Sequence, residues 1–124
     1  MKKIEHIGIA VRNLKNSNKV YESLLGSPPY KMEEVKSEGV RTSFFKIGES
    51  KVELLEASNP ESIISKFIDK RGEGMHHIAF LVDDIESEIL RLKREGFVVL
   101  NETPKKEPII NGLLSCTLKP QVGV

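Results

Sequence analysis

The sequence predicts an α+β fold built from two βαβββ modules, because the chain repeats itself. Residues 5–11 read EHIGIAV and residues 76–82 read HHIAFLV, which places His6 and His77 at equivalent positions 71 residues apart. In both copies a polar residue suited to capping a helix follows the apolar segment, and a glycine closes the next stretch. A repeat of this kind is typical of a duplicated structural unit.

The first copy opens with an expected strand at 4–11, which is mostly apolar. Asn13 can cap the helix that follows, and Gly26 suits the left-handed turn that ends it. The residues expected on the buried face of this helix are Leu14, Tyr21, Leu24 and Leu25.

Three more strands are expected after the first helix, because apolar and polar residues alternate between turn signals. They span 30–36, 40–47 and 51–56. Gly39 and the segment 48–50 supply the hairpin turns between them. This completes the first module, at 1–57.

A linker helix is expected within 58–73. Ser58 or Asn59 can cap it, and Pro60 suits its first turn, where a missing N–H costs nothing. We expect the helix to end near Arg71.

The second module, at 74–124, repeats the strand and helix of the first. Its strand is expected at 76–82, its helix cap at Asp83 or Asp84, and its helix end at Gly96. Ile85, Ile89 and Leu92 fall at i, i+4 and i+7, which gives this helix one apolar stripe.

The composition favours a single globular domain over 1–124. Hydrophobic residues make up 39% of the 124 residues and charged residues 30%. The net charge of +1 argues against nucleic acid as a partner, and no apolar run reaches the roughly 20 residues of a membrane span. The lone cysteine, Cys116, and the lack of a secretory signal favour the cytoplasm.

Three side chains form a candidate metal site. Strand residues alternate between faces, so His6 shares a face with Gly8, and His77 occupies the equivalent place beside Ala79. Small neighbours leave room for a cavity. Glu53 lies mid-strand among apolar residues, where a carboxylate is costly unless it is paired or binds a cation. Two imidazoles and a carboxylate from three strands suit a divalent metal ion.

Each of these residues also has a purely structural interpretation. A strand histidine is often half-buried and hydrogen-bonded without being a ligand, and Glu53 can simply face solvent on a half-exposed sheet. The repeat favours the ligand role for both histidines together. His76 is expected to lie on the packing face of its strand and to be structural.

The motifs IEHIGIAV at 4–11, KVELLE at 51–56 and GMHHIAFLVDDI at 74–85 resemble the methylmalonyl-CoA epimerases of the vicinal-oxygen-chelate (glyoxalase/bleomycin-resistance) superfamily. The resemblance covers about 1–106. It implies a homodimer of curved sheets around a metal cavity, with His6, Glu53 and His77 as ligands. It also implies an acyl-CoA substrate, epimerised through a metal-stabilised enolate.

The resemblance leaves three points open. The metal identity is one, since zinc, cobalt, nickel, manganese and iron all accept nitrogen and oxygen ligands of this kind. No catalytic acid or base is assigned. Two other functions fit the same scaffold: a glyoxalase I-type lactoylglutathione lyase, and a metal-free binding protein of the bleomycin-resistance type.

The resemblance stops at Glu107, so the second module is expected to lack its last strand and the carboxylate ligand which the family carries there. Back-translation of 106–122 in another reading frame can yield family-like motifs. We therefore hypothesise a frameshifted tail, caused by a one-base deletion near Lys105 and Lys106; the alternative is a genuine divergent terminus. Residues 113–118 retain β character. Weak epimerase activity is the expected consequence.

Overall fold

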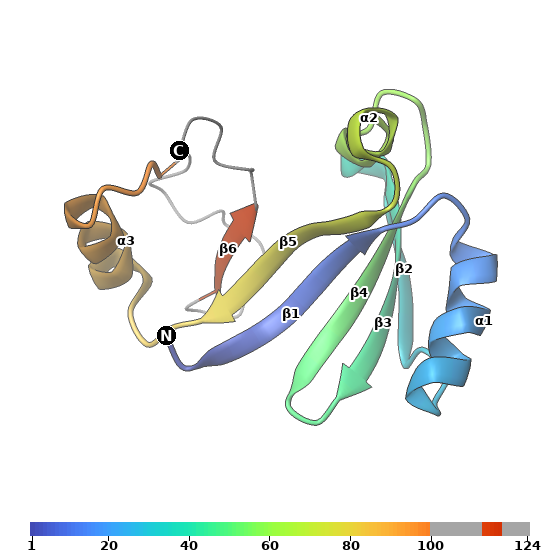
Figure 1. Ribbon diagram of the computed structural model, residues 1–124, viewed down its shortest axis with the longest axis horizontal. Helices are drawn as coiled ribbons and strands as arrows, with labels where there is room; N and C mark the ends of the chain where they lie inside the picture. The colour runs from blue at the N-terminus through green and yellow to red at the C-terminus, as the bar shows by residue number, and fades with distance from the viewer. Residues whose placement is uncertain (100–112, 118–124) are drawn as a thin grey trace.

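The structure, a computed structural model, describes residues 1–99 and the backbone of 113–117. A six-stranded sheet in the order β2-β3-β4-β1-β5-β6 runs through the molecule, with helices at its two ends (Figure 1). The strands are β1 (Lys3–Ala10), β2 (Lys31–Val35), β3 (Val40–Ile47), β4 (Ser50–Ala57), β5 (Gly74–Leu81) and β6 (Leu113–Thr117). The helices are α1 (Leu14–Leu25), α2 (Ile63–Arg71) and α3 (Ile85–Arg94), with a short 3-10 turn at Lys36–Glu38. The predicted α+β class is confirmed.

The first half of the chain forms the predicted βαβββ unit. β1 pairs in parallel with β4, while β3 pairs antiparallel with both β2 and β4. Hairpin turns at Gly39 and Gly48 connect these strands, and both glycines have positive φ angles, of 65° and 56°. The three strands predicted after the first helix therefore exist close to their expected bounds.

Helix α1 begins and ends at the predicted residues. The Asn13 side chain accepts a hydrogen bond from the Asn16 amide, and Gly26 adopts a left-handed φ of 79°. Leu14 is buried, and Tyr21 and Leu25 pack against the core, but Leu24 is 71% exposed. The expectation for Leu24 was wrong, because at 3.6 residues per turn it lies ~80° away from the line through the other three.

Because side chains alternate along each strand, buried apolar residues lie on both faces of the sheet. On one face, Val11, Phe45 and Leu54 pack under α1. On the other face, Ala10 and Leu55 pack with residues of α2. The two helices thus cover opposite faces of the first unit, and the face under α2 is the one that carries the predicted metal ligands.

The linker helix starts later than predicted. Its cap is Ser62, whose hydroxyl accepts a hydrogen bond from the Ser65 amide, so Pro60 precedes the helix. Asn59 forms a turn instead, because its side-chain oxygen accepts from the Glu61 amide two residues on. The end of the helix at Arg71 matches the prediction.

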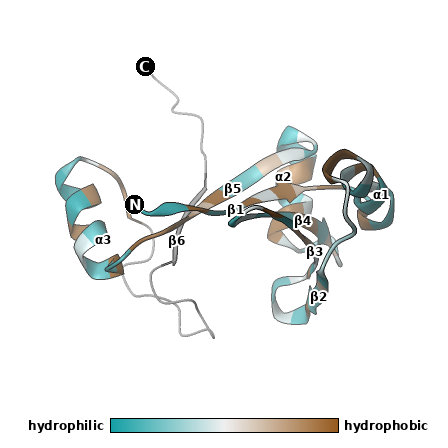
Figure 2. Ribbon diagram, turned by 90° about the horizontal axis from the view of Figure 1, so that it is seen from below, coloured by the Kyte–Doolittle hydropathy of each residue, from teal (hydrophilic) through white to brown (hydrophobic). Residues whose placement is uncertain are grey.

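The two halves of the chain join through the middle of the sheet, where β1 pairs antiparallel with β5. Asp84 rather than Asp83 caps α3, and Gly96, one residue beyond the cap at the other end, has a φ of 93°. Figure 2 shows α3 at the opposite end of the molecule from α1. None of the helices within residues 1–99 has the length and apolarity needed to cross a bilayer.

The tail contributes one described strand, as predicted from its β character. β6 pairs with the edge of β5 that faces away from β1. This position is equivalent to that of β4, which pairs with the edge of β1 that faces away from β5. However, β6 runs antiparallel to its neighbour, whereas β4 runs parallel. The second half therefore does not reproduce the first at this position. The hypothesised deletion at 105–106 and the rest of the tail lie outside the described residues.

Candidate metal centre

The predicted ligands come from three adjacent strands, and the sheet register brings them together. Gly8 of β1 lies opposite Glu53 on one side and His77 on the other, while His6 is two residues earlier on the same face. A β-carbon at residue 8 would overlap the His77 ring. The small neighbour predicted beside His6 is thus needed for contact with His77: because Gly8 has no β-carbon, the His77 ring can lie over β1.

The three ligand atoms lie within bonding distance of a common point. His6 Nε2 is 3.0 Å from His77 Nε2 and 3.2 Å from Glu53 Oε2, and His77 Nε2 is 3.6 Å from the same oxygen. Tetrahedral zinc with bonds of about 2.0–2.1 Å needs ligand atoms about 3.3 Å apart. The geometry and the donor types therefore fit a divalent ion. Within residues 1–99, this is the group of histidine and acidic side chains placed to hold one.

Burial of the three candidate ligands favours the binding of a metal ion. The three side chains are only 14–15% exposed. Burial lowers the pKa of His6 below its ordinary value, and the Glu53 carboxylate opposes this shift. At neutral pH His6 is therefore a neutral imidazole with a free ring nitrogen, which is the form that binds metal ions.

The predicted placement of His76 on the packing face was wrong, because β5 contains a β-bulge. Gly8 pairs with His77, but Ile9 pairs with Met75, so His76 is an extra residue that breaks the alternation. Its ring meets the His77 ring and also packs edge-on against Phe67 of α2. His76 therefore lies on the metal-centre side of the sheet.

A second bulge, in β1, brings in Glu5, which sequence reasoning missed. Ile4 pairs with Phe80 and His6 with Ala79, which leaves Glu5 unpaired between them. The Glu5 side chain is 8% exposed, and its Oε1 accepts a hydrogen bond of 2.8 Å from Lys51 and lies 3.9 Å from His6 Nδ1. The only available signal was the repeat itself, which aligns Glu5 with His76.

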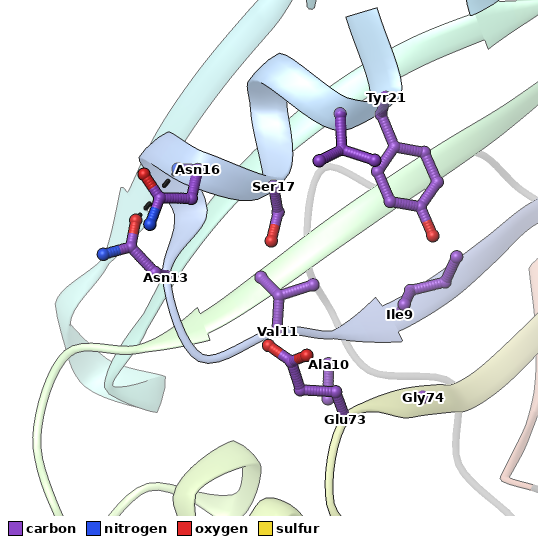
Figure 3. Close-up of a pocket in the computed structure, with 10 residues that line it drawn as sticks. Ile9, Ala10, Val11, Asn13, Asn16, Ser17, Tyr21, Glu73 and Gly74 are labelled. Carbon is purple, nitrogen blue, oxygen red and sulfur yellow. Dashed lines mark hydrogen bonds between the residues drawn. The ribbon is translucent and has the colours of Figure 1, made fainter. Parts of the chain in front are cut away.

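A separate cavity of about 440 Å³ lies on the other side of β1, beneath the start of α1 (Figure 3). Ile9 and Val11 form its floor, while Asn16, Tyr21 and Glu73 contribute to its walls. None of the three candidate ligands lines it. It is therefore distinct from the metal centre.

Comparison with known proteins places the chain in a family. Residues 5–112 match the model of the Glyoxalase/Bleomycin resistance protein/Dioxygenase superfamily. The chain belongs to this superfamily. The glyoxalase-like architecture implied by the sequence motifs is thereby confirmed.

Similar proteins within the superfamily include methylmalonyl-CoA epimerases. The mitochondrial epimerase of Homo sapiens is 32% identical over 104 residues, which cover 83% of this chain and 59% of that protein. A Streptomyces coelicolor methylmalonyl-CoA epimerase in complex with 2-nitronate-propionyl-CoA superposes with a TM-score of 0.76 at 32% identity, covering 86% and 78%. A hypothetical protein from Bacillus halodurans gives a TM-score of 0.79 at 39% identity, covering 98% of both chains. The chain spans about three fifths of the human relative.

Proposed function

We propose that this chain is an isomerase of the methylmalonyl-CoA epimerase type, dependent on a divalent metal ion held by His6, Glu53 and His77. The observation that carries the proposal is the convergence of these three donors from three strands, at separations of 3.0–3.6 Å. Similarity to epimerases, one of them holding an acyl-CoA analogue, supports an acyl-CoA substrate.

The proposed reaction needs a proton to leave the carbon between a thioester and a carboxylate. A divalent ion at this site supplies the Lewis acidity that favours this loss. The chain's part is to present its donors already in place: burial keeps the His6 imidazole neutral at neutral pH, and the register around Gly8 fixes the separation of the donors. Preorganised donors of this kind need little rearrangement during the reaction. Zinc, cobalt, nickel, manganese and iron all suit the donor set.

We further propose that turnover by this chain is weak. The family resemblance implies a fourth ligand, a carboxylate from the last strand, and the sequence after Glu107 does not match the segment that carries it. Three donors bind an ion less tightly than four and leave the reaction site incomplete. A homodimer is proposed from the same resemblance.

The proposal is tested by following exchange of the substrate's α-proton in D₂O. The purified chain is stripped with a chelator and reloaded with each candidate ion before methylmalonyl-CoA is added. We expect slow exchange that requires the metal and is lost in Glu53→Gln, while Glu49→Gln, which alters an exposed carboxylate in a turn, retains it. Exchange that survives removal of the metal would refute metal dependence.

A parallel reaction with methylglyoxal and glutathione separates the epimerase from a glyoxalase I-type lyase. Turnover of that pair, with no exchange of methylmalonyl-CoA, would overturn the proposed substrate. Exchange as fast as that of a full-length epimerase would contradict the proposed weakness alone and leave the reaction type standing.

A further inference from the structure

We propose that Glu5 and His76 are a matched pair of positioning residues, each holding the metal-ligand histidine that follows it. This inference rests on the proposed function, because it assigns roles relative to a metal ion at His6, Glu53 and His77. It concerns residues that alternation along the strands would have directed to the opposite face.

The two residues have equivalent places in the fold. Glu5 and His76 align in the repeat, and each is the extra residue of a β-bulge between β1 and β5. A bulge breaks the alternation of side chains, so two consecutive residues can contact the same site. Each ligand histidine thus has beside it a residue that can contact its outer ring nitrogen, the one that does not face the metal: Glu5 beside His6 and His76 beside His77. We call these two residues outer partners.

The contacts of His76 fix the orientation of His77. The Nδ1 atoms of the two rings are 2.9 Å apart, and His77 Nε2 faces the other donors. A histidine that binds metal through Nε2 carries its proton on Nδ1 and donates it to an outer acceptor. His76 Nδ1 is that acceptor, which leaves the His76 proton on Nε2. The packing of His76 against Phe67 keeps its ring in place.

Glu5 has the corresponding place beside His6. Its Oε1 lies 3.9 Å from His6 Nδ1, so that a small side-chain rotation brings it within hydrogen-bond distance. A carboxylate that accepts from the outer ring nitrogen raises the basicity of the metal-bound one. Glu5 is almost fully buried, and the same Oε1 accepts a hydrogen bond from Lys51. The structure therefore offers an anionic outer partner to His6 and a neutral one to His77.

Metal affinity tests the proposal without any assay of turnover. Cobalt titration followed by visible absorption, with chelator competition for the constants, is carried out on the wild type, Glu5→Gln and His76→Phe. Removal of an outer partner typically weakens metal binding about 10- to 100-fold. We expect a loss of this size for each variant, with a changed cobalt spectrum. The phenylalanine keeps a ring beside Phe67, so packing is retained.

Lys51→Met is the control that separates positioning from simple ion pairing. If Glu5 serves only to pair with Lys51, then Lys51→Met and Glu5→Gln should weaken binding equally, and the proposed role of Glu5 is overturned. If Glu5 acts on His6, Lys51→Met should bind cobalt at least as tightly as the wild type, because a positive charge near the ion is removed. Glu5→Asp, which shortens the carboxylate, replaces Glu5→Gln if circular dichroism shows that the latter is unfolded.

The outcomes also separate this inference from the proposed function. A wild-type chain that binds no divalent ion would overturn both. Wild-type binding that is unchanged in Glu5→Gln and His76→Phe would overturn the positioning roles and leave the proposed metal centre standing.

Discussion

The substitution Gly8→Ala should remove the metal ion while leaving the fold intact. A β-carbon at residue 8 would lie 2.2 Å from His77 Cε1 and 2.7 Å from His77 Nε2. Nonbonded heavy atoms prefer about 3.5 Å or more, so the ring must retreat by about 1.3 Å. Metal–ligand distances tolerate only about 0.2 Å. His77 would therefore cease to be a ligand of the ion shared with His6 and Glu53.

The size of the effect follows from the loss of a ligand. Changes to outer partners cost about 10- to 100-fold in affinity, so displacement of a ligand itself should cost about 100-fold or more. Stability should change little, because the His77 side chain can swing aside and alanine in a strand is favoured over glycine by about 0.5–1 kcal/mol. Zinc titration by calorimetry measures the first quantity, and urea unfolding of the metal-free chain measures the second.

A double-mutant cycle with His77→Ala isolates the cause. In that background there is no ring to displace, so Gly8→Ala should leave the residual metal affinity unchanged and should stabilise the metal-free chain by about 0.5–1 kcal/mol. Wild-type affinity in the single variant Gly8→Ala would refute the reasoning, since the ring would then have met no obstacle.

Three further outcomes are expected of the metal-free chain. Burial lowers the pKa of both His6 and His76 below 6.5, so the unfolded chain takes up protons first as the pH falls. The free energy of unfolding from urea titrations should therefore fall as the pH drops through 6.5; an equal slope in the His6→Gln and His76→Gln variants would contradict this origin. Leu54→Ala should cost about 2–5 kcal/mol, because Leu54 is fully buried beside Phe45. Leu24→Ala, at a position 71% exposed, should change stability by less than about 0.5 kcal/mol in the same titration.

Much of the candidate site could be predicted from two patterns in the sequence. The repeat equated His6 with His77, and the place of Glu53 in mid-strand among apolar residues marked it as a carboxylate in need of a partner or a cation. These inferences need only the repeat and the cost of burying a charge, and the structure brings the three side chains together as expected. Their role as ligands stays a proposal.

The sequence could not show where alternation fails. Nothing in the residues of either strand marks Glu5 or His76 as the extra member of a bulge, because a bulge arises from the pairing of two strands distant in the sequence. The late start of α2 has a local cause. Asn59 and Ser62 both suit a cap, and Asn59 forms a turn that delays the helix. The antiparallel direction of β6 also could not be predicted, because it too depends on how β6 pairs with a strand distant in the sequence.

The two bulges also affect how the strands find each other during folding. A slip of one residue between paired strands sends every side chain to the wrong face, and such a slip would separate His6 from His77. An extra residue in each strand makes the paired edges of β1 and β5 irregular at two fixed points, and a shifted alignment would leave both irregularities unmatched. The two bulges that place Glu5 and His76 beside the ligand histidines thus also favour the correct register between β1 and β5 when the sheet assembles.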